Sequence, residues 1–333
     1  MMESNKNLLA RRQQLKAVTS YLENGRYFFS ADGRVLFKAD QANTLAFMER
    51  NLTAANDDLP ELVIETEQKS SPLGYAVWFG INGDLKLFTP DKVLTFSAGL
   101  DSFQRKLANY HYFSCYFTLP EVLYHNAAER VIIEERVFSQ PISNPDKELL
   151  QRLIGRDYLD YFRKLVKAAD QLEWQSGESR LAESSNNAYQ AEFADLLTLA
   201  SPLLTTPFPR IRVHGDLWTE NILLTAGQKV VYLDWDESEN LFFFFDIFKF
   251  LWNELDVHNE RSYYESYLRG EFDELLSEWF TCFGLSFLPR YRKEYLYLFF
   301  LDFLLAESTT YPYQAKRQEL RDFKKKILEQ DKE

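Results

Sequence analysis

The chain has 333 residues, of which 46% are hydrophobic and 16% aromatic, and its formal net charge is −12 at pH 7. This apolar content is sufficient for a sizeable core in one large domain or two lobes. The acidic balance repels phosphate backbones, so we expect no nucleic-acid partner. The two cysteines, Cys115 and Cys282, lie far apart without a CxxC or histidine-rich neighbour. They predict free thiols in a reducing compartment and not a disulfide framework or a zinc site.

The sequence gives no sign of a membrane segment. The N-terminus carries charges throughout and lacks the apolar central region of a signal peptide. The most hydrophobic stretches, LFFFFDIFKFLW and YLYLFFLDFLL, are too short to span a bilayer, and each contains an aspartate. We therefore expect a soluble, cytoplasmic protein without a membrane partner.

The first half of the chain is predicted to be rich in strands. Residues 6–23 have a helical pattern, and two strands joined by Asp32-Gly33 follow within 26–39, because Asp-Gly is a strong hairpin signal. Hydrophobic periodicity and turn residues then predict, in order, a helix over 41–56, strands over 59–66, 74–81, 84–89 and 92–97, a helix over 100–113, and two strands within 119–137.

From about residue 147 the pattern becomes helical. It predicts two helices within 146–174, a polar connection over 175–189 and a helix over 190–204. Two short strands follow, one after Asn221 and one at 230–233, with a turn over 225–228 between them. Everything beyond the second strand is predicted to be helical, ending in a charged amphipathic helix over 316–333.

The two short strands predict a hairpin with polar side chains at one end. The stretch RVHGDLWTENILL, residues 212–224, places His214, Asp216 and Asn221 around the first strand, and Asp234 follows the second. A hairpin of this length brings Asn221 and Asp234 to the same end. Their oxygen atoms, together with those of Asp216, suit Mg²⁺ carried by substrate phosphates.

The spacing of these residues resembles that of kinases. His-x-Asp-x-x-x-x-Asn, with an aspartate thirteen residues after the asparagine, is the arrangement of the catalytic loop and metal-binding aspartate in protein-kinase-like enzymes. HGDLWTENILL and YLDWDES resemble the aminoglycoside phosphotransferase and choline kinase-like family. The Leu-Trp pair after the aspartate also gives some likeness to fructosamine kinases, although those enzymes have Pro-Ala where this chain has Trp235-Asp236.

The resemblance implies an α+β, two-lobed protein-kinase-like fold. Residues 1–138 would form an N-terminal antiparallel sheet lobe that binds nucleotide and carries a helical extension. Residues 139–333 would form a larger helical C-terminal lobe with the catalytic loop and metal site. The hinge is expected near Glu134 to Val137, with Glu134 among the nucleotide-binding residues.

The family also implies roles for individual residues. Asp216 would accept or orient the proton of the attacking substrate hydroxyl, while Asn221 and Asp234 would hold magnesium ions that bridge the ATP phosphates. His214 would support the catalytic loop, with its ring bonded to nearby backbone, and Asp236 would support the metal residues or add a ligand. Asp246 is interpreted as a helix cap.

The lysine that contacts the ATP phosphates has two possible placements. In the first, GRVLFKA is the third strand of the lobe, Lys38 is the phosphate lysine and Glu49 its helix partner. In the second, KVLTFS is that strand, because it directly precedes a helix. The expected lysine position then holds Thr95 or a neighbour, and the helix offers Gln104, Arg105 and Lys106 where kinases have glutamate.

We therefore expect ATP- and Mg²⁺-dependent phosphorylation of a hydroxyl on a small molecule, such as a sugar, an aminosugar or an amino alcohol. The alternative is a kinase-fold binding module, or pseudokinase, with weak nucleotide capture, because the sequence has no clear glycine-rich loop. The C-terminal helices carry aromatic residues that could line an acceptor pocket near carboxylates such as Glu254, Asp256 and Glu307. We expect most of these aromatic residues to form helical core instead: Trp252, Tyr263, Tyr264, Tyr267, Trp279 and Tyr311.

Overall fold

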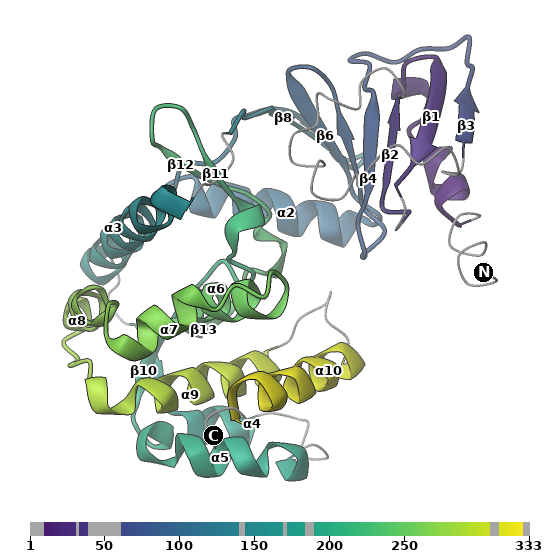
Figure 1. The fold of residues 1–333 in the computed structure, drawn as a ribbon. Coiled ribbons are helices and arrows are strands. Elements are labelled where there is room, and N and C mark those ends of the chain that lie inside the picture. The colour runs from purple at the N-terminus through teal and green to yellow at the C-terminus, as the bar shows by residue number, and fades with distance from the viewer. Residues whose placement is uncertain are drawn as a thin grey trace. The chain divides into compact units, whose positions relative to one another are not determined.

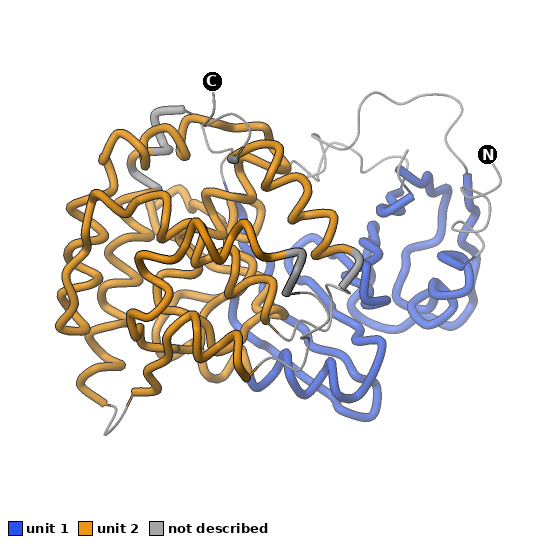
Figure 2. Tube along the Cα trace, turned by 90° about the horizontal axis from the view of Figure 1, so that it is seen from below, with its two compact units in different colours: residues 1–108, 120–141 blue, residues 109–119, 142–333 orange. Residues whose placement is uncertain are grey.

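The computed structural model describes residues 10–30, 33–38, 61–139, 144–168, 172–183, 190–306 and 313–328 (Figure 1). The chain divides into two compact units (Figure 2). Unit 1 comprises residues 1–108 and 120–141, and unit 2 comprises residues 109–119 and 142–333. The predicted division between residues 138 and 139, and the nucleotide-binding role given to the first part, stay predictions.

Unit 1 is built on an antiparallel sheet, as predicted. Its described strands lie in the order β3-β1-β2-β4-β5-β6-β8-β7, and each neighbouring pair is antiparallel. Helix α2 (Leu100–Phe113) follows β6 in the chain. The strands are β1 (Gly25–Phe29), β2 (Val35–Lys38), β3 (Glu61–Ile64), β4 (Ala76–Phe79), β5 (Leu85–Phe88), β6 (Lys92–Phe96), β7 (Val122–Asn126) and β8 (Val131–Glu135).

Both faces of this sheet bury apolar side chains, because successive residues of a strand point to opposite sides. We call one side the N-terminal face; residues of segment 15–22 pack on it against side chains that include Val77, Leu87 and Leu94. We call the other side the aromatic face; it comprises Val35, Phe37, Tyr75, Ala76 and Phe88, with Phe28, Trp78 and Val93 packed against them.

The N-terminal helical extension is shorter than predicted within the described residues. Residues 10–15 are α-helical, and a 3₁₀ turn, η1 (Thr19–Tyr21), follows before β1. The predicted strands of this half are present as β1 to β8. The helix predicted over 41–56 lies outside the described residues.

Unit 2 is mainly helical, with two small sheets. One sheet has the order β13-β10-β9 and the other is the β11-β12 hairpin. Helix α5 packs along α9 (Figure 1). The strands are β9 (Glu173–Gln175), β10 (Phe208–Arg212), β11 (Ile222–Leu224), β12 (Val230–Tyr232) and β13 (Asn240–Phe242). The helices are α3 (Asn144–Ala168), α4 (Gly177–Glu183), α5 (Gln190–Leu204), α6 (Phe245–Asp256), α7 (Ser262–Arg269), α8 (Asp273–Cys282), α9 (Arg292–Leu305) and α10 (Tyr313–Phe323). Short 3₁₀ turns are η5 (Thr219–Asn221), η6 (Trp235–Glu237) and η7 (Pro289–Tyr291), and a π-helical segment, η8 (Lys324–Leu328), follows α10.

Three predictions for this half were wrong. A single helix, α3, spans 144–168, and β9 lies where the second helix was expected to end. The connection over 175–189 contains α4, and β13 interrupts the region predicted to be helical throughout. Strands of three residues are too short to show alternation, and both β13 and the helix after it belong to one aromatic run without periodicity.

The aromatic residues of the C-terminal helices belong to the core of unit 2, as expected for most of them. Trp252, Tyr263, Tyr264, Tyr267 and Trp279 are all buried and contribute to one large apolar cluster. Tyr311 and Glu307 lie outside the described residues. An acceptor pocket built from these buried rings is therefore not available.

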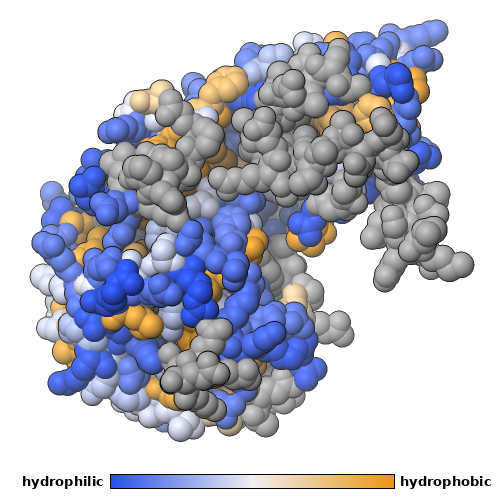
Figure 3. Space-filling model, viewed as in Figure 1, coloured by the Kyte–Doolittle hydropathy of each residue, from blue (hydrophilic) through white to orange (hydrophobic). Residues whose placement is uncertain are grey.

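Figure 3 shows that the visible face of unit 2 is largely hydrophilic, with hydrophobic side chains in small separate groups. Within the described ranges, the helices fall short of the length and apolar character needed to cross a bilayer.

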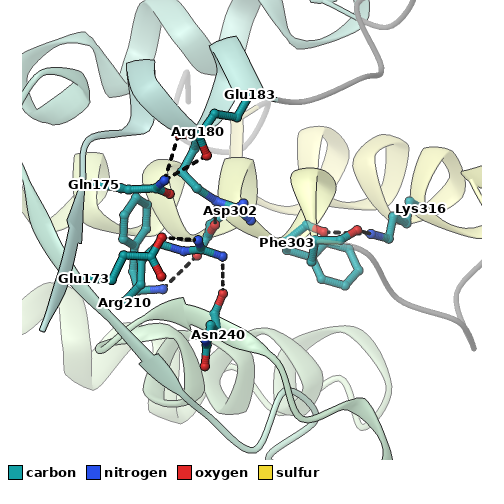
Figure 4. Close-up of polar contacts among 11 residues, drawn as sticks. Glu173, Gln175, Arg180, Glu183, Arg210, Asn240, Asp302, Phe303 and Lys316 are labelled. Atoms are coloured by element: carbon teal, nitrogen blue, oxygen red, sulfur yellow. Dashed lines mark hydrogen bonds and ion pairs between the residues drawn. The ribbon is translucent and has the colours of Figure 1, made fainter.

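A polar cluster joins α4 and α9 to the strands of the three-stranded sheet (Figure 4). Arg180 Nε donates a hydrogen bond to Asp302 Oδ1 at 2.9 Å, and the other carboxylate oxygen accepts one from Phe242 N at 2.9 Å. Arg210 Nη1 donates to Glu173 Oε1 at 2.9 Å, which links β10 to β9. β10 ends just before His214 and β13 ends just before Asp246. This cluster therefore holds the strands from which both segments begin.

Lys316 supports helix α9 at its C-terminal end. Its ammonium group is buried and donates hydrogen bonds to the carbonyl oxygens of Phe303, at 3.1 Å, and Ala306 (Figure 4). Phe303 lies in the last turn of α9 and Ala306 is its C-cap residue, and at a helix C-terminus backbone acceptors lack intrahelical partners and a cation is favoured. Burial lowers the pKa of Lys316, and nearby carboxylates such as Glu239 oppose that shift.

We predict that Asp302→Ala destabilises unit 2 by about 3–5 kcal/mol, because it leaves the guanidinium of Arg180 buried without its carboxylate partner and removes the acceptor of Phe242 N. Arg163→Ala, which breaks an exposed pair with Asp160, should cost about 0–1 kcal/mol. Urea unfolding followed by circular dichroism measures both changes. Equal, small losses would contradict a supporting role for the buried pair.

Candidate active site

The segment 213–221, which we call the 213–221 loop, is anchored by Asp246 near the start of α6. Asp246 Oδ2 accepts a hydrogen bond from His214 N at 2.7 Å and Oδ1 accepts one from Gly215 N at 2.9 Å. Tyr158 Oη also donates to Oδ2, at 2.7 Å. Burial raises the pKa of Asp246, while these donors favour its ionised form. The predicted helix cap was wrong: Phe244 occupies the N-cap position of α6, and the carboxylate of Asp246 fixes the loop instead.

The same helix holds the carboxylate of Asp216. Asn253 Nδ2 donates a hydrogen bond to Asp216 Oδ1 at 3.1 Å. Lys249 Nζ lies 3.7 Å from the same oxygen and 4.8 Å from the ring centre of Phe303. The Lys249 side chain is 1% exposed. Asp216 therefore has a fixed orientation with a buried cation beside it.

Glu254, also on α6, holds the middle of the loop. Its Oε1 accepts hydrogen bonds from Thr219 N at 2.9 Å and Thr219 Oγ1 at 2.7 Å. Its Oε2 contacts His258 Nδ1 at 3.1 Å, and His258 Nε2 contacts Glu220 Oε1 at 3.2 Å. The His258 ring also stacks on Trp218. Residues spaced three, four or seven apart share one helix face, and that face of α6 contacts the loop through Asp246, Lys249, Asn253 and Glu254.

His214 supports the backbone of the loop, as expected from the sequence. Asp216 N donates a hydrogen bond to His214 Nδ1 at 3.3 Å, so Nδ1 is an acceptor. The proton of the neutral ring then lies on Nε2, which donates to Leu233 O at 2.7 Å. The ring is fully buried and its centre lies 4.4 Å from that of Trp235. Both ring nitrogens are thus engaged by backbone, which fits the predicted supporting role.

Asn221 connects Asp216 with the strand end that carries Asp234. Its Nδ2 donates hydrogen bonds to Asp216 O at 2.8 Å and, more weakly, to Asp216 Oδ2 at 3.4 Å. Leu233 N donates to Asn221 O at 2.9 Å, which extends the pairing of Ile222 with Tyr232. The hairpin therefore places Asn221 and Asp234 at the same end, as predicted.

The backbone at Asp234 is strained. Asp234 has φ 58° and ψ 61°, the left-handed conformation, which non-glycine residues adopt at a cost of about 1–3 kcal/mol. Strain of this kind persists where the surrounding structure dictates it. Asp234 begins the turn that leads directly into η6, where Trp235 and the predicted supporting residue Asp236 lie.

The donor set at this end of the hairpin suits Mg²⁺. Asn221 uses its amide nitrogen toward Asp216, which leaves the oxygen Oδ1 as the ligand atom. Asp234 supplies a carboxylate, and Mg²⁺ prefers oxygen ligands from one or two protein groups together with substrate phosphates. Among the residues that the structure describes, no cluster of three or more His, Cys, Asp or Glu side chains could hold a metal by itself.

Gly215 allows the 213–221 loop to lie against the segment after Asp234. Its φ is +85°, and a Cβ atom built there would lie 2.1 Å from Glu237 O. Trp235, next to this contact, stacks on Phe113 with ring centres 3.8 Å apart, and its carbonyl oxygen accepts a hydrogen bond from Asn109 Nδ2 at 2.6 Å. The position after His214 therefore cannot carry the arginine of protein kinases.

The predicted nucleotide-binding residues lie in unit 1. Lys38 lies on β2 and forms an ion pair with Glu23 at 2.6 Å, and Glu49 lies outside the described residues. Glu134 lies on β8 opposite Val93. Thr95 is buried on β6. The position of β6, directly before α2 in the chain and next to β5 and β8 in the sheet, favours the second of the two strand placements.

Residues 147–280 match the APH model, the phosphotransferase enzyme family. The predicted family resemblance is confirmed over this region, which contains the 213–221 loop, Asp234 and α6. No curated protein matches the chain significantly.

Several solved structures have a similar chain trace at low identity. A choline/ethanolamine kinase family protein from Mesorhizobium loti is 17% identical, with 73% of this chain and 85% of that chain covered and a TM-score of 0.40. The aminoglycoside phosphotransferase APH(4)-Ia is 15% identical, with 72% and 86% covered and a TM-score of 0.43. Choline kinase LicA from Streptococcus pneumoniae is 12% identical, with 72% and 89% covered and a TM-score of 0.43.

The contacts that α6 makes in the APH region were not predicted from the sequence. Lys249, Asn253 and His258 were not among the expected site residues. The spacing of Glu254 and His258, four residues apart, was a usable signal because such residues are neighbours on a helix. The contact of Asn253 with Asp216 joins positions 37 residues apart in the chain, and no local pattern encodes it.

We predict that Gly215→Ala destabilises the protein by about 2–4 kcal/mol, because the added Cβ overlaps Glu237 O and the left-handed backbone disfavours alanine. Gly227→Ala is the matched control. Gly227 lies in the β11–β12 turn, where an added Cβ would meet its nearest atom at 3.9 Å. Thermal unfolding should show a clear loss for the first variant and little change for the second. A neutral result at Gly215 would contradict the close packing of the two segments.

A second prediction concerns the pH dependence of stability. Burial opposes protonation of His258, but its contacts with Glu254 and Glu220 outweigh that effect and raise the pKa of His258. A raised folded-state pKa stabilises the fold fully below the unfolded value of about 6.5 and loses this contribution as pH rises through the folded value. His258→Asn should therefore lower the free energy of unfolding more at pH 5.5 than at pH 8.5. Glu220→Gln should reduce this pH dependence in the presence of His258, and an equal loss at both pH values would contradict it.

Proposed function

We propose that this chain is an ATP-dependent phosphotransferase that acts on a hydroxyl group of a small molecule. The observation that carries the proposal is the hydrogen-bonded network of Asp216, Asn221 and the hairpin end at Asp234, within the region that matches the phosphotransferase enzyme family. The anchoring of this network by α6 supports a preorganised site, which phosphoryl transfer requires because catalysis there is mostly positioning and electrostatics.

In this proposal Asp216 accepts or orients the proton of the attacking hydroxyl. Its carboxylate is held by Asn253 and Asn221 and lies beside Lys249. These contacts restrict the carboxylate to one orientation, so a hydroxyl that donates a hydrogen bond to it is aligned for attack. General-base positioning of this kind contributes about 10²–10⁴ in rate.

Asn221 Oδ1 and the carboxylate of Asp234 are the proposed magnesium ligands, with Asp236 as a supporting residue or an additional ligand. Bound Mg²⁺ neutralises the charge that develops on the transferred phosphoryl group. The strained backbone of Asp234 keeps its carboxylate at the end of the hairpin. His214 keeps the loop in place through the backbone of Asp216 and Leu233.

The proposed acceptors are sugars, aminosugars and amino alcohols. Support comes from the 213–221 loop that carries Asp216, where the exposed carboxylate of Glu220 and the aromatic ring of Trp218 both contact His258. A carboxylate next to an aromatic face suits a polar, amine-bearing or hydroxyl-rich molecule.

We predict that Asp216→Asn lowers turnover by at least about 10²-fold while leaving the Kd for MgATP within a factor of about three, because the proposed role is toward the acceptor. Asp234→Ala should weaken Mg²⁺-dependent ATP binding as well. Asp160→Asn, on the exposed side of α3, is the control. Calorimetric titration and ADP release measure the two properties, and full activity in both active-site variants would overturn the assigned roles.

The acceptor can be identified by ADP release from MgATP in a screen of aminosugars, choline-type amines, ketoamines and simple sugars. Turnover of any class above the rate without acceptor supports the phosphotransferase proposal. Binding of MgATP without turnover of any of them would favour the kinase-fold binding module. Turnover of uncharged acceptors alone would contradict the contribution of Glu220 and leave the phosphotransferase proposal intact.

A further inference from the structure

The third strand of a kinase-like sheet normally supplies the lysine for the nucleotide phosphates, and β6 has none on the corresponding face. The side chains of Val93 and Thr95 share one side of β6, because alternate residues of a strand do. Val93 packs on the aromatic face. Lys92 and Leu94 are two residues apart on β6, so their side chains point to the same side of the sheet, and Leu94 belongs to the N-terminal face. The lysine of β6 therefore points away from the aromatic face.

The neighbouring strand carries a lysine at the matching place. Lys86 lies on β5 directly opposite Thr95 of β6 and opposite Trp78 of β4. Its Nζ lies 5.4 Å from the centre of the Trp78 ring. Trp78 packs on the aromatic face, as does Phe88, two residues after Lys86. Cβ atoms of directly opposed residues are about 5 Å apart. The Cβ atom of Lys86 therefore lies about that far from the Cβ atom of Thr95.

Helix α2 supports the assignment of this face. Asp84, two residues before Lys86, forms an ion pair with Lys106 of α2 at 3.0 Å, and both side chains are more than nine-tenths buried. Ser102 Oγ and Ala98 N also donate hydrogen bonds to Asp84. In kinases the helix after the third strand lies on the side of the sheet that binds the phosphates, since its glutamate pairs with the phosphate lysine. Asp84 places α2 on the side to which Lys86 belongs.

In kinases the strand carries the lysine and the helix carries the glutamate of this ion pair. In this chain the two charges are exchanged. The helix offers a lysine, and the strand region supplies the carboxylate. Two residues after Asp84, Lys86 rests over the ring of Trp78, where a cation is attracted by the π face.

Lys38, the alternative, lies on the other side of the sheet. It is opposite Tyr27 on β1, and Tyr27 belongs to the N-terminal face. Its Nζ forms an ion pair with Glu23 at 2.6 Å. β2 is also separated from β6 by two strands in the sheet order.

We propose that Lys86 on β5 is the residue of unit 1 that binds the nucleotide phosphates, in place of a lysine on β6. This inference rests on the proposed ATP-dependent function and names one residue of its nucleotide site. Lys86 contributes a positive charge to the phosphates and no contact to the nucleoside. Its contribution to binding therefore increases with the number of phosphates, from AMP to ADP to ATP.

Binding can be measured without turnover, by calorimetric titration of the full chain with MgATP, MgADP, AMP and adenosine. Lys86→Met should raise the Kd for MgATP by about 10- to 100-fold, as expected for loss of a charged hydrogen bond. The Kd for adenosine should stay within about threefold, and Lys86→Arg should retain most of the affinity for MgATP. Lys92→Met, on the same sheet but the opposite face, should bind MgATP like the wild type.

A lysine moved back to β6 gives a stricter test. The double variant Lys86→Thr with Thr95→Lys should recover part of the MgATP affinity that Lys86→Thr loses, because it places an ammonium group on the neighbouring strand of the same face. Thermal unfolding of each variant without ligand shows whether it is folded. If Lys86→Met misfolds, the Lys86→Thr and Lys86→Arg pair provides the comparison.

The outcomes separate this inference from the proposed function. Wild-type protein that fails to bind MgATP would overturn the ATP-dependent function itself. Wild-type binding that Lys86→Met and Lys86→Thr leave unchanged would overturn the role of Lys86 alone, and a loss in Lys38→Met would then assign the role to Lys38. An equal loss for adenosine and MgATP in Lys86→Met would also overturn the inference, because it would indicate damage to the sheet.

Discussion

The candidate active site depends on one buried carboxylate. Asp246 accepts hydrogen bonds from the backbone nitrogens of His214 and Gly215 and from the hydroxyl of Tyr158. The carboxylate holds these two consecutive nitrogens, and the positive φ of Gly215 then turns the chain directly before Asp216. The cost of burying the charge is offset by three donors. The turn that presents Asp216 is therefore specified by α6, far along the chain.

That constraint explains how polar chemistry is placed within an aromatic core. Helix α6 is almost entirely buried, so each of its polar side chains needs a partner. Asp246, Asn253 and Glu254 find theirs on the 213–221 loop. The loop, in turn, has backbone donors that a short irregular segment cannot satisfy by itself. Each element completes the hydrogen bonds of the other, and the result is a rigid loop on a rigid helix.

The sequence predicted those parts of the molecule whose signal is local. Alternation and turn residues identified the strands of unit 1, and the motif from His214 to Asn221 identified the loop and the hairpin. Strand β13 and helix α4 were missed because a three-residue strand and a seven-residue helix carry too little periodicity. Asp246 was singled out but misinterpreted, since its position at a helix start is local information whereas its hydrogen bonds to His214 and Gly215 are not.

The lysine proposed to bind the nucleotide phosphates is a second example of a site residue that local sequence patterns do not reveal. A sequence motif assigns a function to a position along one strand, whereas a ligand meets a surface made by several strands. Residues directly opposite each other on neighbouring strands occupy nearly the same place on that surface, so a charge can move from β6 to β5 with little displacement in space. The sequence separation between Lys86 and Thr95 hides this equivalence, and only the register of the two strands reveals it.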